Sequence, residues 1–354
     1  MAGRILEASG RGRTRAADFR DPQIEMAHGA GGKATRRLIE TLVAPLLLEG
    51  ERPLGDSAFV GVGGQQIAMT ADTFVVRPLT FPGGSIGTLA VHGTVNDLAV
   101  SGALPTALLV TFVLEAGLPG PVLEAEVRAM GEAARAAGVE IVGGDTKVVE
   151  HGRADGMYVT TAGVGVRDPR ASLSAAAVRP GDRVLLSGPI GDHGTTVLLA
   201  RGQVSFDAEL RSDTRSVWPL VDGLLTAAGA GVRWMRDPTR GGVATALHEL
   251  AEDARLGVAL HEEQVPVRDE VRGVCEILGL DPLHIANEGQ FLAIVAPEYA
   301  DRALSALRAL PGGEAAAIIG DIRETPAAVV IAHSSYGTSR VVDMLVGDPL
   351  PRIC

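Results

Sequence analysis

The hydrophobic and polar positions of this chain alternate between two periodicities. Short apolar runs of strand-like composition recur along the chain, bounded by glycine, proline and small polar residues. We predict strands at 67–70, 106–114, 140–145, 158–166, 183–188, 290–295, 316–319 and 327–331. Between them, apolar residues three and four positions apart predict helices over 86–98, 121–137, 214–228, 242–255 and 298–310. This interleaving indicates a mixed α/β fold.

The segment from Arg167 to Pro180 interrupts this pattern with prolines and small residues. Because a chain of 354 residues is longer than most single domains, we predict two α/β domains, at 24–168 and 169–333. The arginine-rich start, 1–23, lacks the apolar stretch of a secretory signal and is expected to be a disordered leader. The final residues, 334–354, are expected to form a mobile tail.

The composition narrows the possible function classes. A hydrophobic content of 46% with 21% charged residues is that of a globular protein. The net charge of −11 argues against broad nucleic-acid binding, which relies on a basic face. Two cysteines in this length indicate no disulfide framework, and no apolar run is long enough to cross a bilayer. We therefore expect a cytoplasmic protein.

Acidic residues beside glycines or at strand ends form the most informative set of polar positions. The members are Asp56, Asp72, Asp97 with Asn96, Asp145 with Thr146, Asp192 and Asp237. A magnesium ion at a phosphate site is held by one or two carboxylates together with phosphate oxygens. Any one such residue is more often an Asx turn or a helix cap. Because six similar settings recur, we predict single aspartates on loops that bind a Mg-nucleotide.

Two glycine-rich segments bear on phosphate binding. The run from His28 to Lys33 departs from the Walker A pattern, so a flexible turn is its default interpretation. The run Asp237-Pro238-Thr239-Arg240-Gly241-Gly242 leads into a predicted helix, whose free N–H groups can hold an anion. Thr239 could cap that helix instead, but the adjacent Arg240 favours phosphate binding near Gly241. No dinucleotide-binding glycine pattern is present.

Four single residues carry candidate chemistry. Glu288 precedes a buried strand and either faces solvent or acts as a general base. Lys147 is either a surface lysine or a charge that stabilises phosphate and developing anions. Cys275 lies in an amphipathic run and is expected to be a buried structural thiol. Cys354, at the tip of the proline-containing tail, is either an accidental end or a nucleophile.

Together these motifs resemble the HypE family of hydrogenase maturation proteins. That family belongs to the PurM-like superfamily, which includes aminoimidazole ribonucleotide synthetase and selenophosphate synthetase. The superfamily features are Gly55-Asp56, Thr70-Ala71-Asp72, Asn96-Asp97-Leu98-Ala99, Gly143-Gly144-Asp145-Thr146, Gly191-Asp192-His193-Gly194 and Asp237 to Gly242. The features closer to the HypE family are Met26 to Gly32, Asn287-Glu288-Gly289 and Pro351-Arg352-Ile353-Cys354. The resemblance runs from about Ile24 to Cys354.

The resemblance implies a two-domain PurM-like fold and a homodimer whose N-terminal sheets pair into a barrel, with ATP and Mg²⁺ bound beside that interface. It implies that a carbamoyltransferase, HypF, loads a carbamoyl group onto Cys354. The chain would then dehydrate this group to a thiocyanate, and a HypC–HypD complex would receive the cyano group for the iron of [NiFe] hydrogenase.

The resemblance also implies a role for each candidate residue. Catalysis falls to Cys354, Glu288 and Lys147, with the order in which the last two handle the proton left open. The residues implied to hold Mg²⁺ are Asp56, Asp97 and Asp237. Further nucleotide contacts are implied for Asp72, Asn96, Asp145, Thr146, Asp192, Thr239 and Gly241.

Two other functions are compatible with the motifs. A small-molecule ATP-dependent synthetase or kinase of the same superfamily would have no use for the thiol of Cys354. A non-enzymatic carrier would bind nucleotide only to control its docking on partners.

Overall fold

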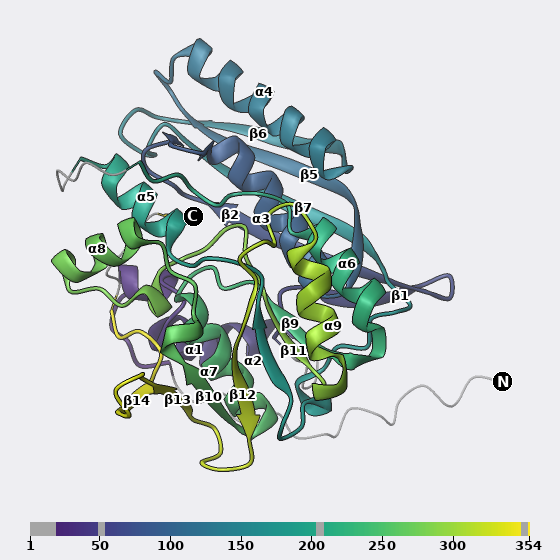
Figure 1. Cartoon of the computed structure of the whole chain (residues 1–354). Helices are drawn as coiled ribbons and strands as arrows, with labels where there is room; N and C mark the ends of the chain where they lie inside the picture. The colour runs from purple at the N-terminus through teal and green to yellow at the C-terminus, as the bar shows by residue number, and fades with distance from the viewer. Residues whose placement is uncertain (1–18, 49–53, 203–208, 348–352) are drawn as a thin grey trace, which may run out of the picture.

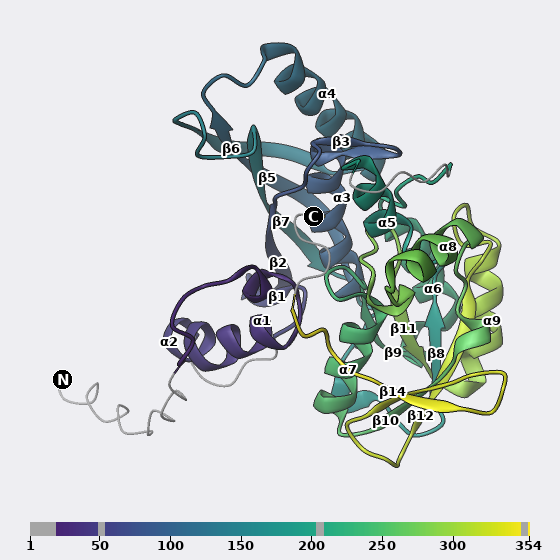
Figure 2. The same cartoon turned by 90° about the vertical axis from the view of Figure 1, so that its left-hand side faces the viewer.

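A computed structural model of the chain describes residues 19–48, 54–202, 209–347 and 353–354. It consists of two lobes that each contain a β-sheet and helices (Figures 1 and 2). The Cys354 end lies between the sheet of the first lobe and helix α5 (Asp192–Ala200) of the second (Figures 1 and 2). Within the described residues, every helix is too short or too polar to cross a membrane.

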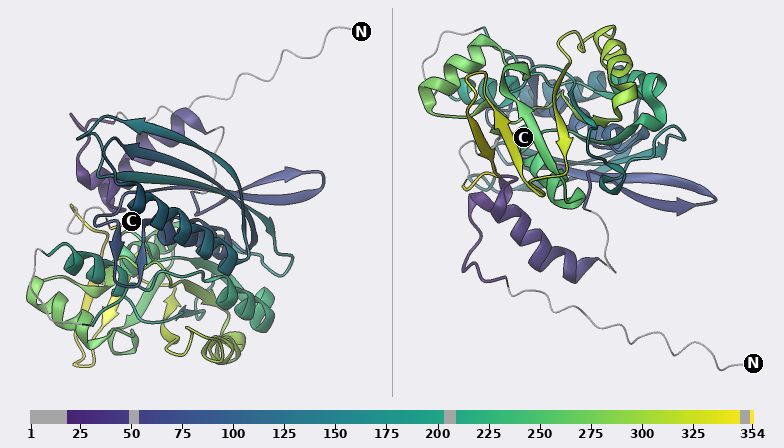
Figure 3. Two further views of the ribbon diagram at one scale, coloured as in Figure 1. Left: turned by 90° about the horizontal axis from the view of Figure 1, so that it is seen from above. Right: turned by 60° about the horizontal axis from the view of Figure 1, so that its bottom comes forward.

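The first lobe is built on a five-stranded sheet in the order β1-β2-β7-β5-β6. The strands are β1 (Ala58–Val62), β2 (Gln65–Phe74), β5 (Ala103–Glu115), β6 (Glu140–Val149) and β7 (Met157–Arg167). Only β5 and β6 pair in parallel, and the other neighbours are antiparallel. The β1–β2 hairpin projects beyond the other strands (Figure 3). A two-stranded ribbon, β3 (Thr80–Phe81) with β4 (Gly84–Ser85), precedes the first long helix.

The two faces of this sheet have different surroundings. Helices α3 (Ile86–Val100) and α4 (Gly120–Ala137) pack on one face, here the inner face. Alternate residues of β7 are buried there, as the two-residue period of a strand requires. The opposite, outer face carries exposed apolar side chains, which are Val60, Met69, Leu104, Leu109 and Val166. An apolar sheet face of this kind is typical of a surface that another protein covers.

The second lobe is built on a seven-stranded sheet in the order β14-β13-β10-β12-β8-β11-β9. The strands are β8 (Arg183–Leu186), β9 (Val232–Arg236), β10 (Gly257–His261), β11 (Leu292–Val295), β12 (Ala317–Arg323), β13 (Val330–His333) and β14 (Ser339–Val342). The helices are α5, α6 (Trp218–Ala228), α7 (Gly242–Ala254), α8 (Asp269–Leu278) and α9 (Pro297–Arg308). Short 3₁₀ turns lie at Ala175–Ala177, Gly229–Gly231, Glu262–Gln264 and Pro282–His284.

Both faces of this second sheet are buried. Val184 and Leu186 of β8 pack with α7, whereas Leu185 between them packs with α6 and α9. The same division holds along β11, whose pattern is apolar at all four positions. A sheet with helices on both faces needs such continuous apolar strands. Polar site residues of this lobe are therefore found next to the strands, as Asp237 after β9 and Glu288 before β11 are.

The N-terminal segment forms a separate helical stretch beside the two lobes (Figures 2 and 3). Its elements are a 3₁₀ turn (Met26–Gly29), α1 (Lys33–Leu38), a π-helical turn (Ile39–Val43) and α2 (Ala44–Leu47). Phe19 packs edge-on against His28, and Asp21 binds His28 and Arg37. The described part of the expected leader thus contacts the helical stretch, while residues 1–18 lie outside the described residues.

Most predicted helices and strands of the central regions are confirmed, with ends shifted by a few residues. The predicted helix over 298–310 is α9, and the predicted strand at 106–114 is β5. The expectation of a tail from Ser334 is wrong in part, because β14 pairs with β13 and extends the sheet. Of the predicted tail, residues 348–352 lie outside the described residues.

Candidate active site

Three aspartates from different elements converge where the lobes meet. Asp56 precedes β1, Asp97 lies near the C-terminal end of α3, and Asp237 directly follows β9. Each offers a carboxylate oxygen, and these oxygens lie within 4.8 Å of one another. Asp237 is buried and the other two are half-buried. Like charges at this distance repel, so the cluster favours a bound cation.

The neighbours of this aspartate cluster only partly offset the repulsion. Thr70 Oγ1 donates to Asp97 Oδ2 at 2.7 Å, and Arg236 Nε lies 3.1 Å from Asp56 Oδ1. Burial raises the pKa of Asp97 and Asp237 well above the usual value, and the nearby carboxylates raise it further. Burial also raises the pKa of Asp56, against the opposing effect of Arg236. The donor set is oxygen alone, which suits a hard cation such as Mg²⁺.

Asp72 adds a fourth carboxylate to this site. It lies on β2 opposite Thr161, which is buried against α3, so its side chain shares the inner face of the sheet. Burial raises the pKa of Asp72, whereas Arg240 lowers it. Arg240 follows Asp237 by three residues and supplies positive charge to the same site. The structure thus adds a cation that the set of predicted site residues omitted.

Glu288 reaches the site from the loop before β11. Its side chain is only 3% exposed, and burial raises its pKa well above the usual value. Asp237, Asp213 and Asp72 raise that pKa further, whereas Arg240 opposes the shift. A carboxylate with a raised pKa is a stronger base than a solvated one. The sequence-based alternative in which Glu288 faces solvent is therefore wrong.

The backbone of Glu288 is held from two directions. Asn96 Nδ2 on α3 donates to the Glu288 carbonyl at 3.1 Å. The two carboxylate oxygens of Asp213 accept the N–H groups of Glu288 and Gly289, each at 3.1 Å. A β-carbon at Gly289 would lie 1.9 Å from the Asp213 carbonyl oxygen, so only glycine fits there. Asp213 therefore positions Glu288, although no glycine or strand end marks it in the sequence.

Cys354 lies beside these charged groups. Burial raises the pKa of its thiol to about 12, Arg240 opposes the shift, and Glu288, Asp72 and Asp237 add to it. Conversely, Cys354 is the largest influence on Arg240, whose pKa it raises. The residue is half-buried against an apolar cluster to which both lobes contribute. The structure thus brings together the thiol, Glu288 and the aspartate cluster, which are far apart in the sequence.

The last two residues make specific contacts with both lobes. Val75 N donates to the backbone oxygen of Cys354 at 3.1 Å. The imidazole Nε2 of His193 lies 2.5 Å from the carbonyl oxygen of Ile353. The Ile353 side chain is buried in the apolar cluster that contains Phe81. Ile353 and Cys354 therefore lie against both lobes.

Lys147, Asp145 and Thr146 lie away from this site within the chain. All three are exposed on the edge strand β6, and Lys147 Nζ lies 2.9 Å from Asp145 Oδ2. Lys147 pairs with Val113 and through it with Tyr158, which places its side chain on the outer face of the sheet. Asp72 is on the inner face. Lys147 and Glu288 of the same chain therefore lie on opposite sides of the first sheet.

The remaining predicted residues surround the site in supporting positions. Asp192 begins α5 and binds Arg268 Nε at 2.8 Å, and burial raises its pKa to about 6. Thr239 accepts the N–H of Gly242 through its backbone oxygen at 2.9 Å. Gly241 has φ 78°, and a β-carbon there would lie 2.2 Å from Thr245 Oγ1. That backbone brings the start of α7 up to Asp237.

The prediction that the aspartates lie on loops is wrong for four of them. Asp72 and Asp145 are within strands, and Asp97 and Asp192 are within helices. The face of the strand decides whether such a side chain reaches the site. Asp72 points to the inner face and reaches it, whereas Asp145, two residues from Lys147, points to the outer face.

The glycine-rich run from His28 to Lys33 contacts the chain segment that precedes Cys354. Lys33 N donates to the Leu345 carbonyl at 3.2 Å, and a β-carbon at Gly32 would lie 2.5 Å from the same oxygen. Gly31 has φ 76° and packs against Arg240. The turn thus joins the base of the tail to the site.

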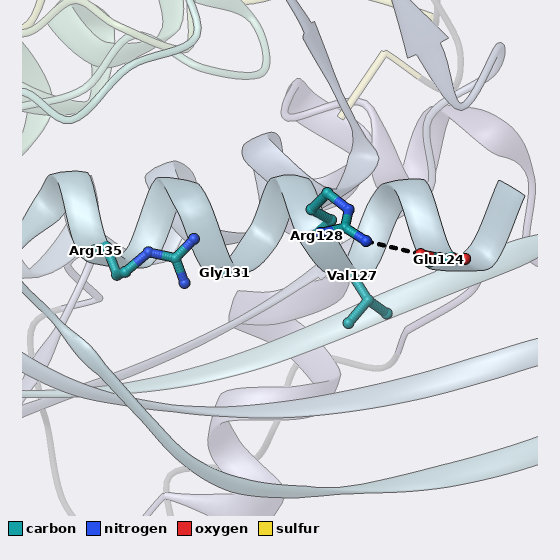
Figure 4. A pocket seen from close by; sticks show the side chains of 5 residues that line it. All are labelled: Glu124, Val127, Arg128, Gly131 and Arg135. Atoms are coloured by element: carbon teal, nitrogen blue, oxygen red, sulfur yellow. Dashed lines mark hydrogen bonds and ion pairs between the residues drawn. The ribbon is translucent and has the colours of Figure 1, made fainter. Parts of the chain in front are cut away.

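A cavity of about 340 Å³ lies elsewhere, on the surface of α4 (Figure 4). Its lining residues all come from that helix, and they are Glu124, Val127, Arg128, Gly131 and Arg135. Glu124 accepts from Arg128 at 2.7 Å, an ordinary surface pair. This cavity shares no residue with the carboxylate site.

Comparisons with known proteins agree with this architecture. The N-terminal domain model of AIR synthase related proteins matches residues 54–167, and the C-terminal domain model matches residues 179–333. The two models cover most of the chain, so it belongs to the AIR synthase related superfamily, which is PurM-like. The first model matches the lobe of the five-stranded sheet, and the second matches most of the lobe of the seven-stranded sheet.

Within that class the chain belongs to the HypE carbamoyl dehydratase family. Carbamoyl dehydratase HypE of Rhizobium leguminosarum bv. viciae is 46% identical over 338 residues, which cover 95% of this chain and 97% of that protein. A solved HypE–HypF complex has a HypE chain 42% identical, with a TM-score of 0.82, covering 87% of this chain and 99% of that one. A solved HypE in complex with ATP is 41% identical, with a TM-score of 0.78, and the match covers 94% of this chain and 100% of that one.

Proposed function

We propose that this chain uses ATP to dehydrate an S-carbamoyl group on Cys354 to a thiocyanate, which supplies cyanide ligands to the iron of [NiFe] hydrogenase. The observation that carries the proposal is the position of Cys354. Its thiol lies beside Arg240, Glu288 and two aspartates, Asp72 and Asp237, of a site suited to a metal-bound nucleotide. A substrate attached to that sulfur would need no separate binding pocket.

The proposed reaction balances without a further reactant. The amide oxygen of the carbamoyl group attacks the γ-phosphorus of ATP, and ADP leaves. The activated group then breaks its C–O bond while the nitrogen loses two protons, which gives a nitrile and dihydrogen phosphate. The oxygen that leaves the carbamoyl group therefore ends in phosphate. Such a route avoids oxide as a leaving group and requires mainly positioning and charge neutralisation.

The site residues have distinct parts in this scheme. Asp56, Asp97 and Asp237 would hold Mg²⁺, which supplies charge neutralisation for the transferring phosphoryl group. Glu288 is the proposed base for the amide N–H. Its carboxylate is buried beside the sulfur of Cys354 and does not belong to the aspartate cluster that would hold Mg²⁺. Arg240, next to both, would stabilise negative charge on the carbamoyl oxygen.

The remaining predicted residues complete the nucleotide site in this proposal. They are Asp72, Asn96, Asp145, Thr146, Asp192, Thr239 and Gly241. Asp72 and the backbone at Gly241 lie beside the aspartate cluster. Asn96 acts by holding Glu288 in place. Asp192 supports the start of α5, which carries His193.

Lys147 would enter the reaction from a second copy of the chain. It lies on the outer face of the first sheet, whose apolar residues are exposed, with Met69 at 49% and Leu109 at 47%. Pairing of two such faces in a homodimer would bury this surface and form the shared barrel. The same pairing would bring β6, with Asp145 and Lys147, against the partner. Lys147 would there contact nucleotide or carbamoyl oxygen.

Two further partners follow from the proposed chemistry. The tail must receive its carbamoyl group from a carbamoyltransferase, HypF, and must deliver the cyano group to an iron scaffold, HypC–HypD. The solved HypE–HypF complex supports the first of these partners. The solved HypE complex with ATP supports the nucleotide.

The transfer of oxygen from substrate to phosphate tests the proposal. The chain would be loaded with a carbamoyl group carrying heavy oxygen, incubated with Mg-ATP, and the released phosphate analysed by mass spectrometry. We expect one heavy oxygen in the phosphate for each carbamoyl group lost. A Cys354→Ser chain would give none, and Cys275→Ala would behave as the wild type.

Other results would favour the alternative functions. Full ATP-dependent activity on a small molecule by a chain lacking residues 343–354 would indicate a synthetase or kinase. Normal loss of the carbamoyl group from Glu288→Ala and Lys147→Ala chains would indicate a carrier that binds nucleotide without catalysis.

A further inference from the structure

We propose that His193 is a latch for the tail, and that it sets the balance between a docked tip, available for dehydration, and a free tip, available for loading. The tip here means Ile353 and Cys354. This inference rests on the proposed function, since it concerns the access of the carbamoylated thiol to the site. His193 contacts Ser212, Phe81 and the Ile353 backbone among the described residues, and we assign it the part of a positioning residue.

The latch is a hydrogen bond to the tail backbone. His193 Nε2 lies 2.5 Å from the Ile353 carbonyl oxygen, one residue before the thiol-bearing position. Val75 N binds the backbone oxygen of Cys354 at 3.1 Å from the opposite side. The tip is therefore held between α5 of the second lobe and the segment after β2 of the first. Contacts to backbone oxygens fix the thiol without involving the sulfur.

The other contacts of the His193 ring indicate that its Nε2 donates the hydrogen bond to the Ile353 carbonyl. Its Nδ1 lies 2.8 Å from Ser212 Oγ, and its ring packs edge-on against Phe81 at 5.4 Å. The side chain is buried, and burial lowers its pKa to about 4. The ring is then neutral near pH 7 and has one N–H. Because the Ile353 oxygen can only accept, that proton is on Nε2, and Ser212 donates to Nδ1.

An apolar socket completes the latch. The Ile353 side chain is 6% exposed and belongs to the cluster that includes Phe81, Val271, Cys275 and Ile285. Burying such a side chain favours the docked tip about 30-fold. The hydrogen bond favours it about fivefold more. Because these contributions are finite, a small fraction of the chains has a free tip, and a partner protein can bind that tip.

The base of the tail is held separately. Lys33 N binds the Leu345 carbonyl at 3.2 Å, and His284 Nε2 lies 2.9 Å from the Asp343 carbonyl. Release of the tip can therefore leave the base in place. The latch at His193 is the contact that would open during loading.

This arrangement predicts opposite effects on the two half-reactions. Only a free tip can be loaded by the carbamoyltransferase, and only a docked tip is placed beside Glu288. Loss of a hydrogen bond worth about 1 kcal/mol lowers the docking constant about fivefold. A His193→Ala chain should then be loaded faster and dehydrated more slowly. A general loss of structure would slow both.

The test uses the full chain with HypF, in wild-type, His193→Ala, His193→Gln and Ile353→Ala forms. Three rates are measured by intact mass spectrometry: alkylation of Cys354 by iodoacetamide, loading of the carbamoyl group, and single-turnover loss of water after Mg-ATP is added. His151→Ala is the matched control, because that histidine side chain is 88% exposed. Ile353→Ala empties the socket without changing either lobe, so it tests docking even where His193→Ala folds poorly.

We expect alkylation and loading to rise about fivefold in His193→Ala, with slower loss of water. Ile353→Ala should change the rates in the same directions, and His193→Gln, which keeps an N–H donor, should lie closer to the wild type. The latch is refuted if both histidine variants are alkylated and loaded at wild-type rates, or if loading slows together with dehydration. If the wild type itself loses no water with Mg-ATP, the proposed function fails, and the alkylation rates still test the latch.

Discussion

Asn96 and Glu288 are joined across the two lobes by a buried hydrogen bond of 3.1 Å from the Asn96 amide to the Glu288 carbonyl. The same amide donates to the Arg215 carbonyl at 3.0 Å, and its oxygen accepts the Val217 N–H at 2.8 Å. One side chain thus satisfies three backbone groups of the second lobe. The proposed base is therefore fixed relative to the helix that carries Asp97.

Asp213 should affect catalysis through the position of Glu288. In Asp213→Asn, one of the two oxygens that accept the Glu288 and Gly289 N–H groups becomes an NH₂ group, which cannot accept. We expect the turnover number for water loss to fall by about tenfold or more, with the KM for ATP unchanged. Steady-state kinetics in ATP measures both values. Asp222→Asn is the control, and a change confined to the KM would contradict the assignment.

The aspartate cluster should respond to magnesium through Asp97. Asp97→Asn removes one of three mutually repelling charges, so the metal-free chain should be more stable than the wild type. The same change should weaken Mg²⁺ binding by at least about tenfold and remove most of the thermal stabilisation that Mg²⁺ gives. Thermal melting with increasing Mg²⁺ concentration measures both effects. Asp222→Asn, an exposed aspartate that pairs with Arg170, is the matched control. Equal stabilisation of the Asp97 variant and the wild type by Mg²⁺ would exclude Asp97 as a ligand.

The glycine-rich turn before α1 offers a matched pair of substitutions. A β-carbon at Gly32 would lie 2.5 Å from the Leu345 carbonyl oxygen, whereas one at Gly29 meets nothing within 4 Å. Gly32→Ala should displace the base of the tail and cost about 1–3 kcal/mol of stability. Gly29→Ala should change stability by less than about 0.5 kcal/mol. Urea unfolding compares the two, and limited proteolysis near Leu345 reports the tail. If the variants were equally stable, the turn would not hold the tail.

The low pKa of His193 should appear in the pH dependence of stability. The folded chain binds this proton only near pH 4, whereas the unfolded chain binds it near pH 6.5. Below pH 6.5 the unfolded state holds the additional proton, so the free energy of unfolding falls as the pH falls. Between pH 6.5 and 5 the His193 contribution is about 2 kcal/mol. His193→Gln should lack this part of the decline, as urea unfolding at the two pH values would show. Parallel declines in both chains would contradict a buried neutral imidazole.

Local sequence patterns predicted much of the secondary structure. The apolar run of β11 and the stripe of α9 are each set by residues within a few positions, so their periodicity is visible in the sequence. Helix α3 was predicted from the same spacing, and it is buried on nearly all sides. The short helices α1, α2 and α5 were missed, because their runs are brief and glycine-rich or polar. Helix α8 was missed although its apolar residues recur at helical spacing, and the strands β1, β9, β10 and β14 were missed as well.

The assembly of the site depends on contacts that the sequence does not encode locally. Strand alternation places Lys147 and Asp72 on defined faces, but which face the helices cover is decided by packing. Arg240 stood inside the predicted run Asp237 to Gly242, but its proximity to Cys354 requires the fold. Asp213 acts on Glu288 from far along the chain, so no short motif marks it as a site residue. His193 stood inside a predicted motif, yet its contact with Ile353 requires the fold.

The proposed dehydration is tested most directly by the intact mass of the Cys354 peptide after loading by HypF, with and without Mg-ATP. We expect a carbamoyl group on Cys354 in both samples before nucleotide is added. Mg-ATP should then lower the mass by one water molecule on Cys354 alone, with Cys275 unmodified. An unchanged mass in the presence of Mg-ATP, or the same loss of water from a Glu288→Ala chain, would contradict it.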